Sequence, residues 1–90
     1  MSKRIAFTVQ GRVQGVNYRA WTAQKANGLN VTAYARNADD GTVVGEAQGD
    51  ESSLDKFAQC LKVGPLHAQV TSVEQTDIPT KNGESKFDRL

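Results

Sequence analysis

The stretch GRVQGVNYR, residues 11–19, combines two glycines with an arginine directly after a polar and apolar run. It follows RIAFTVQ, whose alternation is typical of a strand, and it precedes a helical pattern. Glycines let such a loop curl so that several amide N–H groups converge, and the dipole of the following helix adds partial positive charge. Arg19 would lie on the first helical turn, and its guanidinium can grip a phosphate with two N–H groups. The stretch therefore predicts an anion site, with a purely structural turn as the alternative.

The other side chains that could take part in catalysis or metal binding do not form a cluster in the sequence. His67 and Cys60 are the only histidine and the only cysteine, so no zinc site of about four ligands is predicted. We expect a surface role for His67 and a half-buried packing role for Cys60. No GxxxxGK[ST] run is present, which excludes a nucleotide-binding loop of that type. Asp39 and Asp40 lie in ADDGT, where we expect them to serve a turn.

Alternation and helical spacing predict the elements that must position this loop. Strands are expected at RIAFTVQ, at VTAYARN and around Val43 to Ala47. A first helix should run from Tyr18 to Gly28 or Asn30, with one apolar face.

The second half of the chain predicts a second helix and further strands. The helix should begin at Asp50 or Ser52 and end at Gly64-Pro65. A strand follows with a bulge near Thr71 or Ser72, and a polar loop leads to a short strand around Phe87.

The order strand, helix, strand, strand, helix, strand predicts a ferredoxin-like split βαβ sandwich of the α+β class (βαββαβ). We expect an antiparallel sheet with both helices on one face, and a fifth strand if the C-terminal segment splits. Residues 1–90 are expected to form a single domain, since this length supports one modest core.

Composition excludes several classes of protein. The chain is 38% hydrophobic and 23% charged with a net charge of +1, which is typical of a globular protein and points to neither nucleic acid nor anionic lipid. No signal-peptide pattern or membrane span is recognisable. A lone cysteine favours a reducing compartment. We therefore expect a cytoplasmic protein. We also expect a monomer, although neither composition nor cysteine count indicates the oligomeric state.

GRVQGVNYR, followed by ARNADDGTV, Gly49 and GPLHAQV, resembles the acylphosphatase family from the first strand to Phe87. The resemblance implies hydrolysis of the mixed anhydride between a carboxylic acid and phosphate. It also implies two catalytic residues, Arg19, which binds the phosphoryl group with the loop amides, and Asn37, which orients the attacking water. The expected phosphate-binding residues are Arg12, Val13, Gln14, Gly15, Val16, Asn17 and Arg19.

Three positions depart from the family pattern. Tyr18 stands where phenylalanine is usual, so its hydroxyl needs a partner or a route to solvent. Asn30 replaces a frequent glycine, which suits a left-handed cap. Arg89 occupies an end-strand place where an apolar residue is common; we expect this to affect packing of that strand and to touch neither functional position.

The expected chemistry needs neither a cofactor nor a metal. An acyl phosphate expels a carboxylate without help from a general acid, and the motif holds no nucleophilic Cys, His or Asp, so direct attack by water is expected. Two alternatives remain: a non-catalytic anion-binding module, as in larger maturation proteins with an acylphosphatase-like segment, and an RNA-recognition module. The strand TVVGEAQG lacks the stacking aromatics that the second would need.

Overall fold

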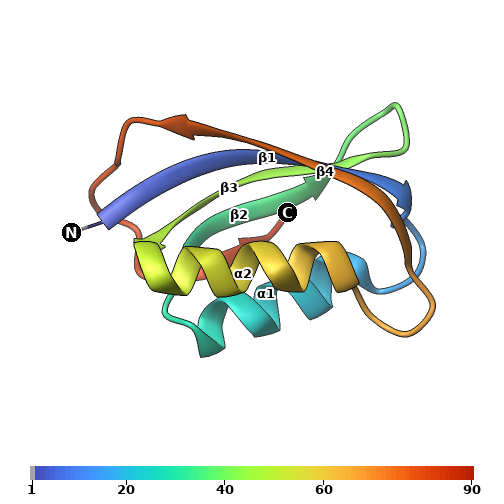
Figure 1. The fold of residues 1–90 in the computed structure, drawn as a ribbon, viewed down its shortest axis with the longest axis horizontal. Helices are drawn as coiled ribbons and strands as arrows, with labels where there is room; N and C mark the ends of the chain where they lie inside the picture. Colours follow the sequence, from blue (N-terminus) through green and yellow to red (C-terminus); the bar gives the residue numbers. More distant parts are fainter. Residues whose placement is uncertain (1) are drawn as a thin grey trace.

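The chain forms a five-stranded sheet with both helices packed against one face (Figure 1). The computed structural model describes residues 2–90. Its elements are β1 (Ser2–Arg12), α1 (Tyr18–Gly28), β2 (Thr32–Asn37), β3 (Val43–Asp50), α2 (Glu51–Val63), β4 (Gln69–Ile78) and β5 (Phe87–Arg89). The strand order is β4-β1-β3-β2-β5. The predicted α+β class, the βαββαβ order and the fifth strand are confirmed.

The sheet is mixed, so the prediction of an antiparallel sheet is wrong for its last strand. β1 pairs antiparallel with β3 and β4, and β2 pairs antiparallel with β3, whereas β5 runs parallel to β2. Residues 79–86 carry the chain from one edge of the sheet around the end near the N-terminus to the other edge (Figure 1). β4 and β5 run in opposite directions, so this loop around one end of the sheet brings β5 in beside β2 and parallel to it. The polar sequence of the loop carries no periodic signal for that placement.

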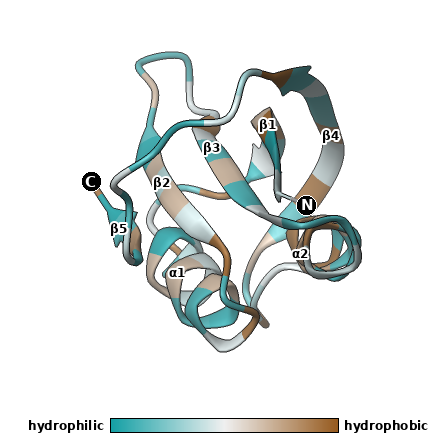
Figure 2. Cartoon of the chain, turned by 90° about the vertical axis from the view of Figure 1, so that its left-hand side faces the viewer, coloured by the Kyte–Doolittle hydropathy of each residue, from teal (hydrophilic) through white to brown (hydrophobic). Residues whose placement is uncertain are grey.

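The core lies between the sheet and the helices. Ile5, Phe7 and Val9 of β1 are buried on the helix face, where they meet the buried stripe of α2. Phe57 of that stripe packs edge-on against Phe7 at 5.8 Å between ring centroids and lies 5.5 Å from Phe87. Figure 2 shows the two helices side by side beneath the strands. Neither helix within residues 2–90 has the length and apolar character that crossing a membrane requires.

α1 follows the predicted pattern at both ends. Tyr18, Thr22 and Ala26 form its buried face. Asn30 lies just beyond the helix with a φ of 58°, the left-handed conformation expected of it. The buried Tyr18 hydroxyl donates to the carbonyl of Leu61 at 2.7 Å, so the departure from phenylalanine is satisfied by a hydrogen bond to α2.

A bulge aims the end of β1 toward the loop that follows. Gln10 pairs with Ser72 and Gly11 pairs with Val70, which leaves Thr71 without a partner, where the bulge was predicted. Gly11 has a φ of 126°, and a Cβ there would lie 2.0 Å from the carbonyl oxygen of Gln69. Only glycine fits this position, and the bend it permits delivers the chain to the start of α1.

Candidate active site

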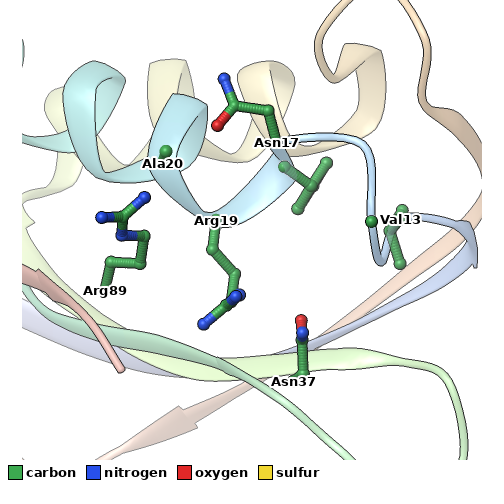
Figure 3. Close-up of a pocket in the computed structure, with 8 residues that line it drawn as sticks. Val13, Asn17, Arg19, Ala20, Asn37 and Arg89 are labelled. Atoms are coloured by element: carbon green, nitrogen blue, oxygen red, sulfur yellow. The ribbon is translucent and has the colours of Figure 1, made fainter.

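A small pocket lies where the loop after β1, the start of α1, the end of β2 and β5 meet (Figure 3). Its volume is about 90 Å³. The lining residues come from all four of these segments: Val13, Gly15, Asn17, Tyr18, Arg19, Ala20, Asn37 and Arg89. The pocket therefore joins residues that are far apart in the sequence.

The loop presents main-chain donors at this pocket. Gly15 has a φ of 74° and Asn17 a φ of 67°, so two nearby residues take the left-handed conformation that curls a chain into an anion-binding concavity. Among the described residues, the amide N–H groups of residues 14–17 donate to no main-chain acceptor. No side chain caps α1, and its first turn holds no acidic residue. The buried Val13 anchors the loop to the core, as predicted.

Arg19 is the second residue of α1, and its half-buried side chain points from the helix toward the sheet (Figure 3). Its Nη1 donates to the main-chain oxygen of Leu90, directly after β5. Among residues 2–90 it forms no ion pair with an Asp or Glu side chain. One contact thus steadies the guanidinium while other N–H groups remain for the pocket.

Asn37 closes the pocket from the sheet side. It is the last residue of β2, and its exposed side chain points from the strand into the pocket (Figure 3). Its position on the helix face follows from alternation, since the buried Ala33 and Ala35 precede it by four and two residues. The two residues expected to be catalytic, Arg19 and Asn37, therefore line the same pocket.

Gln14 lies outside the pocket lining but ties the loop to the neighbouring turn. Its Nε2 donates to the carbonyls of Ala38 at 2.8 Å and Thr42 at 2.9 Å. The same turn is closed by Asp40, whose Oδ1 accepts hydrogen bonds from the amide and hydroxyl of Thr42 at 3.1 and 2.6 Å. These bonds lower the pKa of Asp40 and confirm its role in the turn. Gln14 therefore fixes the loop relative to Asn37.

Two residues of the expected phosphate-binding loop line a different hollow. Arg12 and Val16 line a separate, shallow hollow together with the exposed His67. Gly15 and Asn17 line both hollows, so the loop separates them. Neither Arg12 nor Val16 is part of the lining of the small pocket, so the phosphate-binding role expected of them stays a prediction.

Arg89 is the site residue that the sequence analysis missed. Its end-strand position was expected to touch neither functional residue, but it lines the pocket together with Arg19 and Asn37. Arg89 pairs with Ala35 in the parallel ladder, and Phe87, two residues earlier, is buried. Alternation therefore puts Arg89 on the helix face beside the strand that carries Asn37. The spacing of two residues from Phe87 indicates that Arg89 lies on the helix face, but the sequence does not show which strand is the neighbour of β5.

Comparisons with known proteins show to which family the chain belongs. Residues 5–89 match the family model described as Acylphosphatase. This chain belongs to the acylphosphatase family. Acylphosphatases are hydrolases that act on small acyl phosphates, and this is the reaction and substrate class of the chain.

Individual relatives cover nearly the whole chain. The Acylphosphatase of Clostridium perfringens is 42% identical over 84 residues, which are 93% of this chain and 94% of the relative. The crystal structure of acylphosphatase from Bacillus subtilis has a TM-score of 0.93 at 30% identity and covers 100% of this chain and 99% of its own. The structure of HypF from T. kodakarensis has a TM-score of 0.84 at 26% identity, with 98% of this chain but only 12% of that longer chain covered.

Proposed function

We propose that this acylphosphatase holds the phosphoryl group of its substrate with the amides of residues 12–17 and with Arg19, while Asn37 orients the attacking water. The observation that carries the proposal is the shared pocket. Arg19 from α1 and Asn37 from β2 line it together with a loop whose amides at residues 14–17 donate to no main-chain acceptor.

The leaving group decides what the site must supply. An acyl phosphate expels a carboxylate whose conjugate acid has a pKa of about 4, so it departs without protonation. The oxygen of water forms a bond to phosphorus, the bond from phosphorus to the carboxyl oxygen breaks with its electron pair, and the protons of water pass to phosphate and solvent. No general acid is required, and positioning and charge stabilisation remain.

The loop and Arg19 supply that charge stabilisation. Main-chain N–H groups and a guanidinium can bind the non-bridging oxygens, whose negative charge is spread over the transferred group. Arg19 is suited to this because its contact with Leu90 uses only one nitrogen. We propose that hydrolysis proceeds without a metal or other cofactor, since these donors provide the positive potential.

Asn37 can hold a water without adding charge. An amide offers both an acceptor and a donor, whereas a carboxylate in its place would repel the phosphoryl group. The eight lining residues include no cysteine, histidine or carboxylate that could form a phosphoenzyme. Direct attack by water therefore fits the site better than a covalent intermediate.

The same chemistry limits the substrate. A phosphate monoester of an alkyl alcohol expels a poor leaving group. The pocket lining contains no His, Asp, Glu, Lys or Cys that could protonate it, and the hydroxyl of Tyr18 already donates to the carbonyl of Leu61. We propose that turnover of such monoesters is weak or absent.

We further propose that residues 1–90 act as a single-domain, cytoplasmic monomer that binds no nucleic acid. The lone Cys60 suits a reducing compartment, and the net charge of +1 offers no basic surface for a polyanion. Light scattering at the assay concentration, together with titration of labelled RNA, tests the monomer and the absence of nucleic-acid binding; a dimer or tight RNA binding would contradict this part.

Release of phosphate from benzoyl phosphate, with a chelator present, tests the proposed function. The parent should turn over, and Asn37→Ala should lower kcat about 100-fold while the inhibition constant of inorganic phosphate stays within about twofold. Gln24→Ala, at an exposed position of α1, is the control and should behave as the parent. An Asn37→Ala variant with the parent's kcat would overturn the role of Asn37, and dependence on added metal would overturn the metal-free mechanism.

A further inference from the structure

The pocket lining contains a second guanidinium, that of Arg89. Arg19 and Arg89 line the same small pocket, and none of its other lining residues is acidic. In Figure 3, Arg89 lies on the side of Arg19 away from the loop residue Val13. Two cations at one pocket repel each other unless an anion lies between or beside them.

The fold holds Arg89 at this place. Its pairing with Ala35 sets it beside β2, and the amide of Leu90 donates to the carbonyl of Ala35 at 2.9 Å, which extends the ladder past Arg89. Ala35 is fully buried and small, which leaves room on the helix face for a long side chain. The backbone next to Arg89 is therefore fixed while its side chain is exposed.

No Asp or Glu side chain among residues 2–90 pairs with Arg89. The ion pairs among residues 2–90 do not include it, and the adjacent Asp88 is paired with Lys86 at 3.6 Å. Asp88 also points to the other face of the sheet because it alternates with Phe87 and Arg89. The donors of Arg89 are thus available to a ligand that enters the pocket.

We propose that Arg89 determines substrate specificity by binding a second anionic group, on the acyl part of the substrate. Arg19 and the loop amides engage the phosphoryl group, and Arg89, farther from the loop, meets a carboxylate or phosphate borne by the acyl moiety. The preferred substrates are then acyl phosphates with a second negative charge. This inference rests on the proposed function, because it takes the loop as the place of the phosphoryl group.

The test compares 3-carboxybenzoyl phosphate with its methyl ester, which differ in one negative charge at the same place on a rigid ring. Arg89→Met should lower kcat/KM for the carboxylated substrate about fivefold to tenfold and leave the ester within about twofold. Arg89→Lys should retain part of the preference because it keeps the charge. Arg36→Met removes the same charge from an exposed position on the other face of β2 and should change neither substrate.

The outcomes separate this inference from the proposed function. An equal loss on both substrates, with weaker inhibition by inorganic phosphate, would mean that Arg89 binds the phosphoryl group and would overturn the specificity role. No change on either substrate would overturn it as well. A third substrate carries a phosphate group in place of the carboxylate on the same ring. If Arg89→Met lowers kcat/KM more for this substrate than for the carboxylated one, the second group is a phosphate. A parent that hydrolyses neither compound would contradict the proposed function itself.

Discussion

Two arginines of this molecule show how the same side chain can serve structure or ligand binding. Arg4 of β1 is 2% exposed on the face of the sheet opposite the helices, and its donors are used by Glu46 at 2.7 Å, Glu84 at 2.6 Å and Gln48 at 3.1 Å. Arg19 is half-buried at a pocket, donates to one main-chain oxygen and, among residues 2–90, pairs with no Asp or Glu side chain. A guanidinium saturated by the chain stabilises the fold, whereas one left with unused donors is suited to bind an anion.

The surroundings of Arg4 explain why it belongs to the fold. Glu84 lies in the crossover between β4 and β5, so the ion pair holds that segment against the sheet. These contacts raise the pKa of Arg4, chiefly through the hydrogen bond to Glu84, and lower the pKa values of Glu46 and Glu84. The crossover leads directly into β5, which carries Arg89.

Substitution of Arg19 should have the largest effect on activity. Arg19→Met removes the cation that faces the developing charge, so kcat/KM for benzoyl phosphate should fall about 1000-fold. The free energy of unfolding should change by less than about 0.5 kcal/mol, because no Asp or Glu side chain is left unpaired. Steady-state kinetics and urea denaturation measure both, with Arg36→Met as the control. A loss of only a few-fold would remove Arg19 from the proposed mechanism.

Substitution of Arg4 should have the opposite effect, a loss of stability rather than of activity. Arg4→Met leaves Glu46 and Glu84 without their partner, and the free energy of unfolding should fall by about 2–3 kcal/mol, less than for a fully buried pair because both carboxylates are partly exposed. Lys3→Met is the matched control, since its pair with Asp77 is exposed and should contribute less than about 0.5 kcal/mol. Urea denaturation would contradict the structural role of Arg4 if both variants were equally stable.

Gln14 tests whether the loop must be fixed relative to Asn37. Gln14→Ala removes both hydrogen bonds to the turn carbonyls, so kcat/KM for benzoyl phosphate should fall about tenfold through poorer alignment. Gln24→Ala, exposed on α1, is the control of equal chemistry. Unchanged kinetics in Gln14→Ala would show that the loop holds its position without this side chain.

The smallest expected effect is on the free energy of unfolding at acid pH, where Glu46 and Glu84 become protonated. The pKa values of Glu46 and Glu84 are lowered from the ordinary value of 4.5 by the hydrogen bonds from Arg4. Their contribution is therefore complete above about pH 5 and is lost as the pH falls through the lowered values in the folded state. Glu84→Gln should be less stable than the parent at pH 7 and approach it at low pH, as measured by urea denaturation. A constant difference from pH 7 to pH 3 would contradict this.

Much of the fold could be predicted because its signals are local. Alternation in β1, β2 and β3 and the buried stripes of the two helices predicted the elements, and the bulge at Thr71 followed from the change of parity between Val70 and Val73. The direction of β5 could not be predicted in this way, because it depends on a polar crossover with no periodicity. For the same reason the sequence did not predict that Arg89 lines the pocket, because its neighbour across the parallel ladder is set by tertiary structure.

The candidate site was predictable where one contiguous motif carries it. Arg19 and the loop were proposed from GRVQGVNYR, and the resemblance added Asn37; all of them contribute to the pocket lining. Arg12 and Val16 were expected to bind phosphate as part of this loop, which stays a prediction, and the structure places both residues along another hollow. A motif indicates which segment binds, while the left-handed residues in it determine which side chains face the ligand.

Binding of inorganic phosphate, measured by titration calorimetry on the parent, Arg19→Met and Arg4→Met, tests the contrast between the two arginines most directly. Under conditions where all three proteins are folded, the parent and Arg4→Met should bind phosphate with dissociation constants within about twofold of each other, and Arg19→Met should show no measurable binding. Phosphate binding that survives in Arg19→Met, or that is lost in folded Arg4→Met, would contradict the division of roles between them.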